Sequence, residues 1–418
     1  MTRIAVIGAG ISGLTVAHLL SHNTNNEVIV FEREAIPGGL IRCERVEGSL
    51  FHLCGGHVFN SKRADVLDWF WKQFDKFSEF HAAERRSVVY MPDGLTVPYP
   101  IEDHMYYFPR DIQESFERDL CEIEKTYRSE PVNFEEFLRG RFGETLYRLY
   151  FEPYNRKIWR RDLKDVSLSW LEGKLPMPTV DEMRYNNLHH VEEKQFVHSS
   201  FFYENHDGSQ FLANRLAEGL HIRYQSPVQE VELRGERIYI NGEEFDQMVW
   251  CGNIKHLVAL IQHIPHIDDY WKSVQNLDYH GTTAVFCDLD PNPYTWVYQP
   301  SDAHDSHRII CTGNFAQTNN AEGKMTGTVE FTDKISEKDI QAQLERMPFH
   351  PRYITHHYSP YTYPIQNRDT RNMIRSLKEL LAPHHIFFTG RFADWEYYNM
   401  DVAMGEAMDL CRMFPIGV

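Results

Sequence analysis

A glycine pattern near the N-terminus constrains the fold more than any other feature of this chain. Gly8, Gly10 and Gly13 form G-x-G-x-x-G between "RIAVI", an apolar run typical of a buried strand, and the helix-like "LTVAHLLSH". A second strand, "EVIVFERE", follows and completes a β-α-β unit. The first glycine permits the tight turn, the second lets a pyrophosphate approach the backbone, and the third lets helix and strand pack closely. The pattern predicts a dinucleotide site at the start of the helix.

The residues after the second strand favour FAD over NAD. Glu32 ends that strand and is placed to bind a ribose hydroxyl. Gly38 and Gly39 follow in "REAIPGGLIR", where a second glycine pair lets the chain pass close to a long cofactor. The segment resembles the fingerprint of FAD enzymes of the glutathione-reductase-2 class, which includes the amine oxidases. That resemblance implies an adenine contact from the backbone at Val228.

The C-terminal segment "FFTGRFADWEYYNMDVAMGEAMDL" predicts a strand, a loop and a helix from about Val402. A helix N-terminus directed at the flavin pyrimidine would stabilise negative charge on a reduced flavin. Arg391 can form a charge-assisted bond with the cofactor pyrophosphate, although a surface cation is the alternative interpretation.

Between these two ends of the chain, segments with a helical hydrophobic pattern are followed by segments with a strand pattern. Periodicity is helical from about 63 to 80 and from 110 to 172, whereas "RRSVVYMPDGLTVPYP" predicts a hairpin and 222–251 a tight meander with an Asn241-Gly242 turn. We therefore predict an α/β fold: a Rossmann-like FAD-binding domain with a helical insert and an antiparallel β-sheet substrate domain. The predicted boundaries are 1–62, 197–257 and 376–418 for the FAD-binding domain, 63–80 and 101–196 for the helical domain, and 81–100 and 258–375 for the sheet domain.

Composition excludes several classes of function. With 60 Asp and Glu against 43 Lys and Arg, the net charge of −17 argues against binding nucleic acid or anionic membranes. No apolar run is long enough to predict a membrane span. Seven scattered cysteines without a C-x-x-C pair indicate reduced thiols in a cytoplasmic protein, and no Cys/His spacing predicts a metal site.

One stretch gathers cations and aromatic rings within this acidic chain. "PYNRKIWRRD", residues 153–162, contains four Lys and Arg residues around Tyr154, Asn155 and Trp159. Pro153 removes a backbone donor, so we expect the preceding helix to kink or restart there. The rings and cations can bind an aromatic anion, or the rings can be core and the cations a solvated helix face. The stretch alone leaves both interpretations open.

Further segments make the chain resemble the UDP-galactopyranose mutase family. They are "GGHVF" (55–59), "VPYP" (97–100), "PYNRKIW" (153–159), "WLEGKLPMP" (170–178), "HRI" (307–309), "YPI" (363–365) and "GRFADWEYYNMDVAMGEA" (390–407). The resemblance implies that reduced FAD forms an N5–sugar adduct and interconverts the pyranose and furanose forms of a nucleotide diphosphate sugar, with no net redox change. It also implies a cellular reductant such as NAD(P)H, and it is compatible with a homodimer.

The resemblance assigns roles to individual residues. Arg308, Tyr363 and Tyr397 match a set that holds the diphosphate; His57 touches the flavin, Tyr154 lies against the base and Trp159 beside the sugar. The implied catalytic residues are Lys174, Arg308 and His57. The implied substrate contacts are Tyr99, Tyr154, Asn155, Trp159, Arg308, Tyr363, Tyr397 and Asn399, with Arg86 as a weaker candidate. The predicted cofactor contacts are Gly8, Gly10, Ser12, Gly13, Glu32, Arg33, Gly38, Gly39, Leu40, His57, Val228, Gly390, Arg391, Met400, Asp401 and Val402.

Four positions depart from the family pattern. Lys174 replaces an arginine, Asn60 a histidine, Asn399 an aspartate, and Asp207 interrupts a glycine pair. A lysine keeps the charge but loses the planar fork of the guanidinium. The sugar and the nucleotide therefore stay open. Two other readings stay open as well: a flavin oxidase of the amine or protoporphyrinogen oxidase class, and a flavoprotein without catalysis.

Overall fold

The computed structural model describes residues 1–125, 130–168, 170–171, 177–191 and 199–413. Its first sheet has five parallel strands in the order β20-β13-β1-β2-β9. They are β1 (Thr2–Ile7), β2 (Asn26–Phe31), β9 (His221–Arg223), β13 (Gln247–Trp250) and β20 (Ile386–Phe388). Segments distant in the sequence thus form one sheet, as the β-α-β start and strand-helix end predict.

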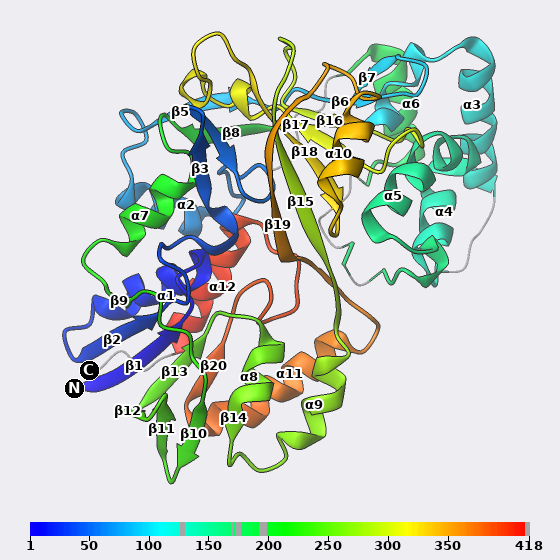
Figure 1. Cartoon of the computed structure of the whole chain (residues 1–418). Helices are drawn as coiled ribbons and strands as arrows, with labels where there is room; N and C mark the ends of the chain where they lie inside the picture. The colour runs from blue at the N-terminus through cyan, green and yellow to red at the C-terminus, as the bar shows by residue number, and fades with distance from the viewer. Residues whose placement is uncertain (126–129, 169, 172–176, 192–198, 414–418) are drawn as a thin grey trace.

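Helices and a small sheet cover the two faces of this parallel sheet (Figure 1). Ile4 and Val6 of β1 pack with α1 (Ile11–Ser21), α2 (Ala64–Gln73), α7 (Ser209–Ala217) and α12 (Met400–Met413). Ala5 and Ile7 point to the other face, because side chains alternate along a strand. That face carries α8 (Ile254–Leu260), α9 (Asp268–Gln275), α11 (Thr370–Leu381) and a sheet of β10 (Val231–Arg234), β11 (Arg237–Ile240), β12 (Glu243–Phe245) and β14 (Ile261–Gln262).

A seven-stranded sheet rises from this domain in the order β19-β15-β18-β17-β16-β6-β7 (Figure 1). Its strands are β6 (Ser87–Tyr90), β7 (Thr96–Pro98), β15 (Asp278–Asp288), β16 (Trp296–Tyr298), β17 (Arg308–Ile310), β18 (Thr326–Thr332) and β19 (Arg352–Ile365). The hairpin β6–β7 was expected, and it joins the sheet at one edge. One pair departs from the predicted antiparallel arrangement: β6 runs parallel to β16.

The two faces of this sheet differ in chemistry. Val88, Val297, Ile309 and Val329 point to one side, where they form a core with α10 (Glu337–Leu344). Their strand neighbours point to the opposite side, which carries Tyr298, Arg308 and Glu330. This second face is where the candidate site lies.

The helical part contains α3 (Arg110–Lys125), α4 (Phe134–Leu146), α5 (Glu152–Trp159) and α6 (Val180–His189). A π-helical turn, Tyr147–Phe151, separates α4 from α5, and Pro153 lies in the first turn of α5. The irregularity predicted at Pro153 is confirmed, since proline cannot donate to the carbonyl of Leu149. After this turn, Tyr154 of α5 contacts Tyr298 of β16, and Lys157 contacts the loop before β17.

The predicted helix over 63–80 is too long. α2 ends at Gln73, and β5 (Phe80–Glu84) pairs with β8 (Ser200–Glu204). Asp75 explains why the helix ends there, because its carboxylate accepts hydrogen bonds from the backbone N–H groups of Phe77 and Ser78 at 2.9 and 3.2 Å.

A further short hairpin, β3 (Cys43–Val46) with β4 (Ser49–His52), precedes α2. The division into three domains stays a proposal.

Among the described residues, no helix has the length and apolar content that a membrane span requires. The described part of the chain also contains no group of three or more metal-ligating side chains. All seven cysteines lie in the described part and are free thiols.

Candidate functional site

The glycine turn after β1 has the geometry of a phosphate cradle. Gly8 has a φ of +104°, which side-chain-bearing residues rarely adopt. A Cβ on Gly13 would stand 1.9 Å from the carbonyl oxygen of Gly8, whereas a Cβ on Gly10 would have the Cα of Gly39 at 3.9 Å as its nearest neighbour. Gly10 is the N-cap of α1, with no side chain of the described residues capping the helix and no acid in its first turn. The first N–H groups of α1 are therefore available to an anion.

Glu32 closes one side of this turn. It is buried at the end of β2, and its carboxylate accepts hydrogen bonds from the N–H groups of Ala9 at 2.6 Å and Glu34 at 2.8 Å. A carboxylate held by backbone donors beside the glycine turn is placed as a ribose contact requires. Arg33 turns outward and pairs with Glu34 at 3.2 Å.

The second glycine pair lies directly against the first. Gly10 and Gly38 form an isolated parallel bridge, and Gly38 N–H donates to the carbonyl of Ala9 at 2.8 Å. His57 reaches the same region, with Nε2 3.0 Å from the carbonyl oxygen of Leu40. Burial, and to a lesser degree the charge of Arg391, lower the pKa of His57 to about 4, so the ring is neutral at pH 7.

The C-terminal segment brings its residues to this turn. Gly390 has a φ of +121°, and a Cβ there would stand 3.1 Å from Oγ of Ser12. Arg391 donates to the carbonyl of Thr362 at 3.1 Å and to that of Tyr398. α12 begins at Met400, so Met400, Asp401 and Val402 form its first turn. Val228 lies half-buried between β9 and β10.

For Arg391 the alternative of a solvated surface cation is wrong. Its guanidinium is held by backbone carbonyls and lies 4.6 Å from the ring centre of Tyr397. Its contact with a pyrophosphate stays a prediction.

The polar face of the seven-stranded sheet builds the second half of the site. Arg308 of β17 lies opposite Tyr298 of β16 and opposite Glu330 of β18, so the three side chains share one face. Arg308 forms an ion pair with Glu330 through Nε and donates to the hydroxyl of Tyr363 at 3.0 Å. Burial alone would lower the pKa of Arg308, but Glu330 and the surrounding tyrosines together hold that pKa well above the ordinary value.

Glu330 also connects the sheet to the loop of His57. It is 1% exposed, and Oε1 accepts a hydrogen bond from the N–H of Gly55 at 2.9 Å. The charge of Arg308 holds the pKa of this carboxyl well below its usual range although burial opposes the charged form. One carboxylate thus joins the glycine loop 55–57 to the guanidinium of Arg308.

Two tyrosines stack beside Arg308. The rings of Tyr363 and Tyr397 are parallel, with centres 5.4 Å apart and planes inclined by 4°. Tyr363 is on β19, whereas Tyr397 is in the loop before α12. Arg308, Tyr363 and Tyr397 therefore lie together, and their contact with a diphosphate stays a prediction.

On the other side of Arg308 the site is aromatic. Tyr154 of α5 stacks on Tyr150 at 5.2 Å and meets Tyr298 edge-on at 5.6 Å. Tyr99 packs against Tyr298 at 4.9 Å. Burial raises the pKa of Tyr154 well above its ordinary value, so it is a neutral phenol. These rings form a wall on which a base can stack.

The cations of 153–162 all have partners within the protein, which favours the second interpretation for them. Arg156 pairs with Glu152 at 3.0 Å, and Arg160 and Arg161 pair with Asp305 and Asp278. Lys157 is buried and donates from Nζ to the carbonyls of Gln299 and Ser306, each at 2.9 Å. Carboxylates and carbonyls therefore satisfy the four charges.

Trp159 and Asn155 lie deeper than a surface site would place them. Trp159 is 7% exposed among Trp170, Phe134 and neighbouring core residues, and its Nε1–H has no partner among the described residues. Asn155 is buried and donates to the carbonyl of Phe151 at 2.7 Å. Both interpretations of the stretch therefore hold in part: Tyr154 is half-buried beside Arg308, and Trp159 belongs to the core.

The departures from the family pattern have varied surroundings. Asn60 donates to the carbonyl of Ser200 at 2.9 Å, and the backbone of Asn399 precedes α12. Asp207 lies on the surface 3.8 Å from Arg45. Lys174 lies outside the described residues.

Arg86, the weaker candidate for a substrate contact, is exposed. Its neighbour Arg85 points inward instead, where it donates to the hydroxyl of Tyr298 and lies 4.5 Å from the ring centre of Trp296.

Sequence reasoning missed Glu330 and Tyr298. Glu330 carries the single charge in "GTVEFT", and an acid at an inward position of a buried strand is the signal that could have identified it. Tyr298 gave no comparable signal, because its place beside Arg308 depends on the pairing of β16 with β17.

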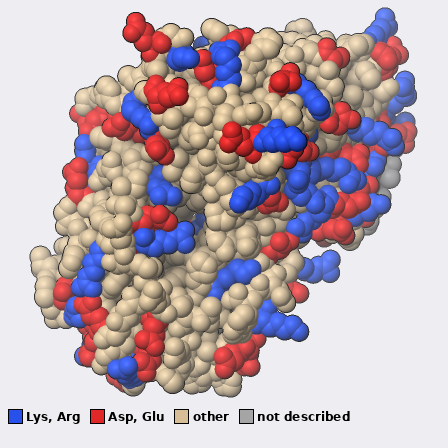
Figure 2. All heavy atoms as spheres, in the orientation of Figure 1, with Lys and Arg blue, Asp and Glu red and all other residues tan. Residues whose placement is uncertain are grey.

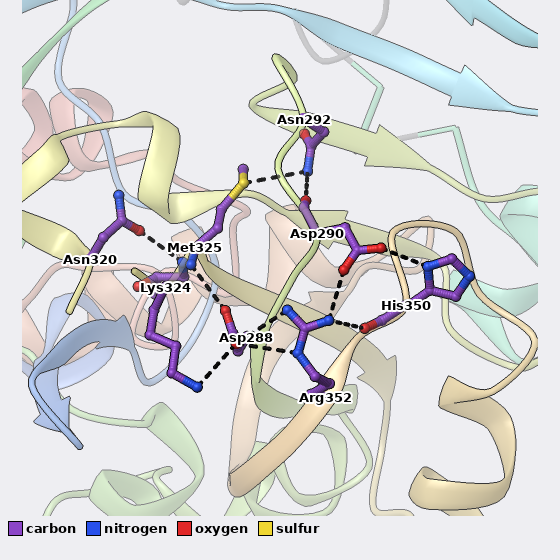
Figure 3. A network of polar contacts seen from close by, with 9 residues as sticks. Asp288, Asp290, Asn292, Asn320, Lys324, Met325, His350 and Arg352 are labelled. Atoms are coloured by element: carbon purple, nitrogen blue, oxygen red, sulfur yellow. Dashed lines mark hydrogen bonds and ion pairs between the residues drawn. The ribbon is translucent and has the colours of Figure 1, made fainter. Parts of the chain in front are cut away.

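A second polar cluster joins the end of β15 to the start of β19, at the opposite end of β19 from Tyr363 (Figure 3). Asp288 accepts from Lys324 and Arg352, each at 3.2 Å, and Asp290 pairs with Arg352 and His350, each at 2.7 Å. Each carboxylate is matched by a cation or a histidine. On the face in Figure 2, Lys and Arg alternate with Asp and Glu, and no broad area of one sign stands out.

Comparison with known proteins agrees with this arrangement. Residues 6–74 match the family described as "NAD(P)-binding Rossmann-like domain". The chain is 24% identical to dTDP-fucopyranose mutase of Escherichia coli over 99% of its own length and 98% of that protein. It is 22% identical to a probable UDP-galactopyranose mutase of Klebsiella pneumoniae, over 99% and 94%.

Solved structures show the same fold. A structure of reduced UDP-galactopyranose mutase superposes with a TM-score of 0.87 at 21% identity and covers 98% of this chain and 93% of that one. A putative protoporphyrinogen oxidase from Exiguobacterium gives 0.74 at 15% identity, over 98% of each chain. The fold prediction is confirmed, and so is the resemblance to the mutases over the whole chain.

Proposed function

We propose that this chain is an FAD-dependent mutase that interconverts the pyranose and furanose forms of a nucleotide diphosphate sugar without net redox change. Its similarity to a dTDP-fucopyranose mutase and to a probable UDP-galactopyranose mutase extends over nearly the full length of all three proteins. The observation that supports the proposal is the link Gly55–Glu330–Arg308, in which one carboxylate joins the loop proposed to touch the flavin to the guanidinium proposed to bind the diphosphate. An oxidase has no use for such a group.

The residues present fit FAD. Gly10 leaves the start of α1 open to a pyrophosphate, and the carboxylate of Glu32 is buried at the ribose position. His57, neutral at pH 7, lies beside the second glycine pair, and the first turn of α12 faces the same region. A bound, reduced flavin would supply the nucleophile that opens the sugar ring.

Arg308, Tyr363 and Tyr397 are proposed to hold the diphosphate. The guanidinium has five donors, of which Glu330 and Tyr363 use two, so its remaining edge can bind phosphate oxygens. Positive charge and hydroxyl donors at this point would stabilise the departing nucleotide diphosphate as it gains charge. Tyr154 would stack on the base.

The proposal is tested by turnover after a single reduction. The FAD-loaded protein is reduced once with dithionite under anaerobic conditions, and UDP-galactopyranose and dTDP-fucopyranose are supplied separately, with a GDP-sugar as a comparison. We expect many turnovers to the furanose per flavin, measured by chromatography of the ring forms. Stoichiometric oxidation of NAD(P)H or consumption of oxygen tied to product would assign the chain to the oxidases instead.

Three further points belong to the same proposal. The protein is expected to work in the cytoplasm with reduced thiols, and NAD(P)H or a cellular equivalent is expected to keep the flavin reduced. A homodimer is compatible with the sequence and is checked by light scattering. The three-domain division is checked by limited proteolysis near residues 63 and 258.

A further inference from the structure

His307 is a buried titratable side chain to which the proposed function gives no task. It precedes Arg308, is 1% exposed, and neither ring nitrogen has a hydrogen-bond partner among the described residues. Its Nε2 lies 3.7 Å from Oε2 of Glu330. Buried polar groups are nearly always satisfied, so an imidazole left without a hydrogen bond beside a buried carboxylate requires an explanation.

The charges around His307 come from three elements. Arg308 adjoins it on β17, Glu330 faces it from β18, and Lys157 approaches from α5, where the ring of Tyr154 also meets it edge-on at 6.4 Å. Burial is the main reason that the pKa of His307 is lowered, and Arg308 adds to it while Glu330 opposes it. His307 is therefore neutral at pH 7 when no ligand is bound.

A bound diphosphate changes this balance. The charge of Arg308 then faces two anions, the buried carboxylate of Glu330 and the diphosphate, and it cannot fully compensate both. A buried carboxylate whose charge is only partly compensated is destabilising. His307 is close enough to supply the missing positive charge by binding one proton from solvent.

We propose that His307 binds a proton when a nucleotide diphosphate sugar occupies the site, and that it thereby stabilises Glu330 while Arg308 holds the diphosphate. His307 is a positioning residue, because it acts through Glu330 and touches neither substrate nor flavin. The proposal rests on the proposed function, since it requires the diphosphate to lie at Arg308. Its consequence is a coupling between proton uptake and substrate binding.

The coupling is measured by titration calorimetry on the oxidised FAD-loaded protein. UDP-glucose is the probe, because both of its phosphates are diesters without a proton that titrates near pH 7. Titrations at pH 7.5 in phosphate and in Tris, which differ in ionisation enthalpy, give the number of protons taken up per ligand bound. We expect an uptake between zero and one proton, and a Kd that rises with pH by at most about tenfold per pH unit.

Two variants isolate the histidine. His307→Gln keeps a polar side chain and cannot change charge, so its proton uptake should vanish and its Kd should no longer depend on pH. His304→Gln is the matched control, because His304 is a second buried histidine on the same loop whose charged neighbours are Lys157, Asp305 and Arg346 rather than Arg308 and Glu330. It should keep the wild-type uptake.

The outcomes separate the two proposals. If wild type binds none of UDP-glucose, UDP-galactopyranose, dTDP-fucopyranose and the GDP-sugar, the proposed function fails. If wild type binds a nucleotide sugar with no proton uptake, or if His307→Gln keeps the wild-type uptake, His307 does not have this role and the proposed function stands. Retained FAD absorbance verifies that each variant is folded.

Discussion

The carbonyl oxygen of Gly8 lies where a side chain on Gly13 would begin: an ideal Cβ on Gly13 would stand 1.9 Å from it. The start of α1 therefore packs on the end of β1 with no room for even a methyl group. Gly10, three residues earlier, has room for a Cβ instead, whose nearest neighbour would be the Cα of Gly39 at 3.9 Å. The same motif thus contains one glycine needed for packing and one that leaves room for a ligand.

Gly13→Ala and Gly10→Val should separate these two roles. Gly13→Ala should destabilise the apoprotein by about 3 kcal/mol or more, because backbone atoms must move. Gly10→Val should leave the free energy of unfolding nearly unchanged, since Gly10 has a φ of −77° that any residue adopts, while FAD occupancy falls sharply. Urea unfolding and flavin absorbance measure both. A Gly10→Val protein that purifies with full flavin would overturn the assignment of the pyrophosphate to this turn.

Arg308→Ala should remove most activity and leave FAD bound. Loss of a charge-assisted bond predicts weaker nucleotide-sugar binding by roughly 1.5–3 kcal/mol, or about tenfold to a hundredfold or more. The variant should also unfold more easily, because Glu330 then lies buried without its partner.

Arg308→Lys is the matched control for this prediction. It keeps the charge near Glu330 and should recover stability more than binding, since it lacks the planar fork. Unchanged kinetics in Arg308→Ala would remove the diphosphate from this position.

Lys174 is expected to act as the cation between flavin and substrate. This prediction rests on the family resemblance of "WLEGKLPMP", because the residue lies outside the described part of the chain. Lys174→Ala should lower turnover by at least about tenfold and make flavin reduction harder, since both anionic states lose a partner. Lys174→Arg should recover part of the activity. Turnover with pre-reduced flavin and the flavin midpoint potential measure this, and wild-type values for Lys174→Ala would contradict it.

The glycine motif made two features predictable: the parallel sheet, and the part of the candidate site around the glycine turn and Glu32. Gly8, Gly10, Gly13 and Glu32 are local in sequence, and each has a steric or electrostatic reason to stand where it does. The break at Pro153 was predictable for the same reason, because one missing N–H determines it. Such features depend on a few neighbouring residues.

The sheet face was less predictable because its residues meet through strand pairing. Arg308, Tyr298 and Glu330 are adjacent only because β16, β17 and β18 pair in one register. The family resemblance supplied Arg308, whereas Glu330 and Tyr298 became visible with the structure. For the cations of 153–162, the sequence showed how many there are but not what they bind. The structure shows that carboxylates and carbonyls of the protein satisfy them.

Lys157 gives a prediction about pH. Its ammonium donates to two loop carbonyls just before Arg308, and burial lowers its pKa to about 7. In the unfolded chain a lysine titrates near pH 10.4. Between these values the unfolded state binds a proton that the folded state lacks, so this group makes the wild-type free energy of unfolding rise with pH, by at most about 1.4 kcal/mol per pH unit.

Lys157→Met removes this contribution together with the two hydrogen bonds. The variant should be less stable at pH 7 because buried carbonyls lose their donor, at about 1–3 kcal/mol for each. The deficit relative to wild type should widen from pH 7 to pH 10, because only wild type gains from the proton difference. Urea unfolding at four pH values measures the deficit, and Lys164→Met, which removes an exposed lysine of the same region, serves as the control. A deficit that stays constant or narrows would mean that Lys157 is not held in a desolvated site, and the loop before Arg308 would then need another anchor.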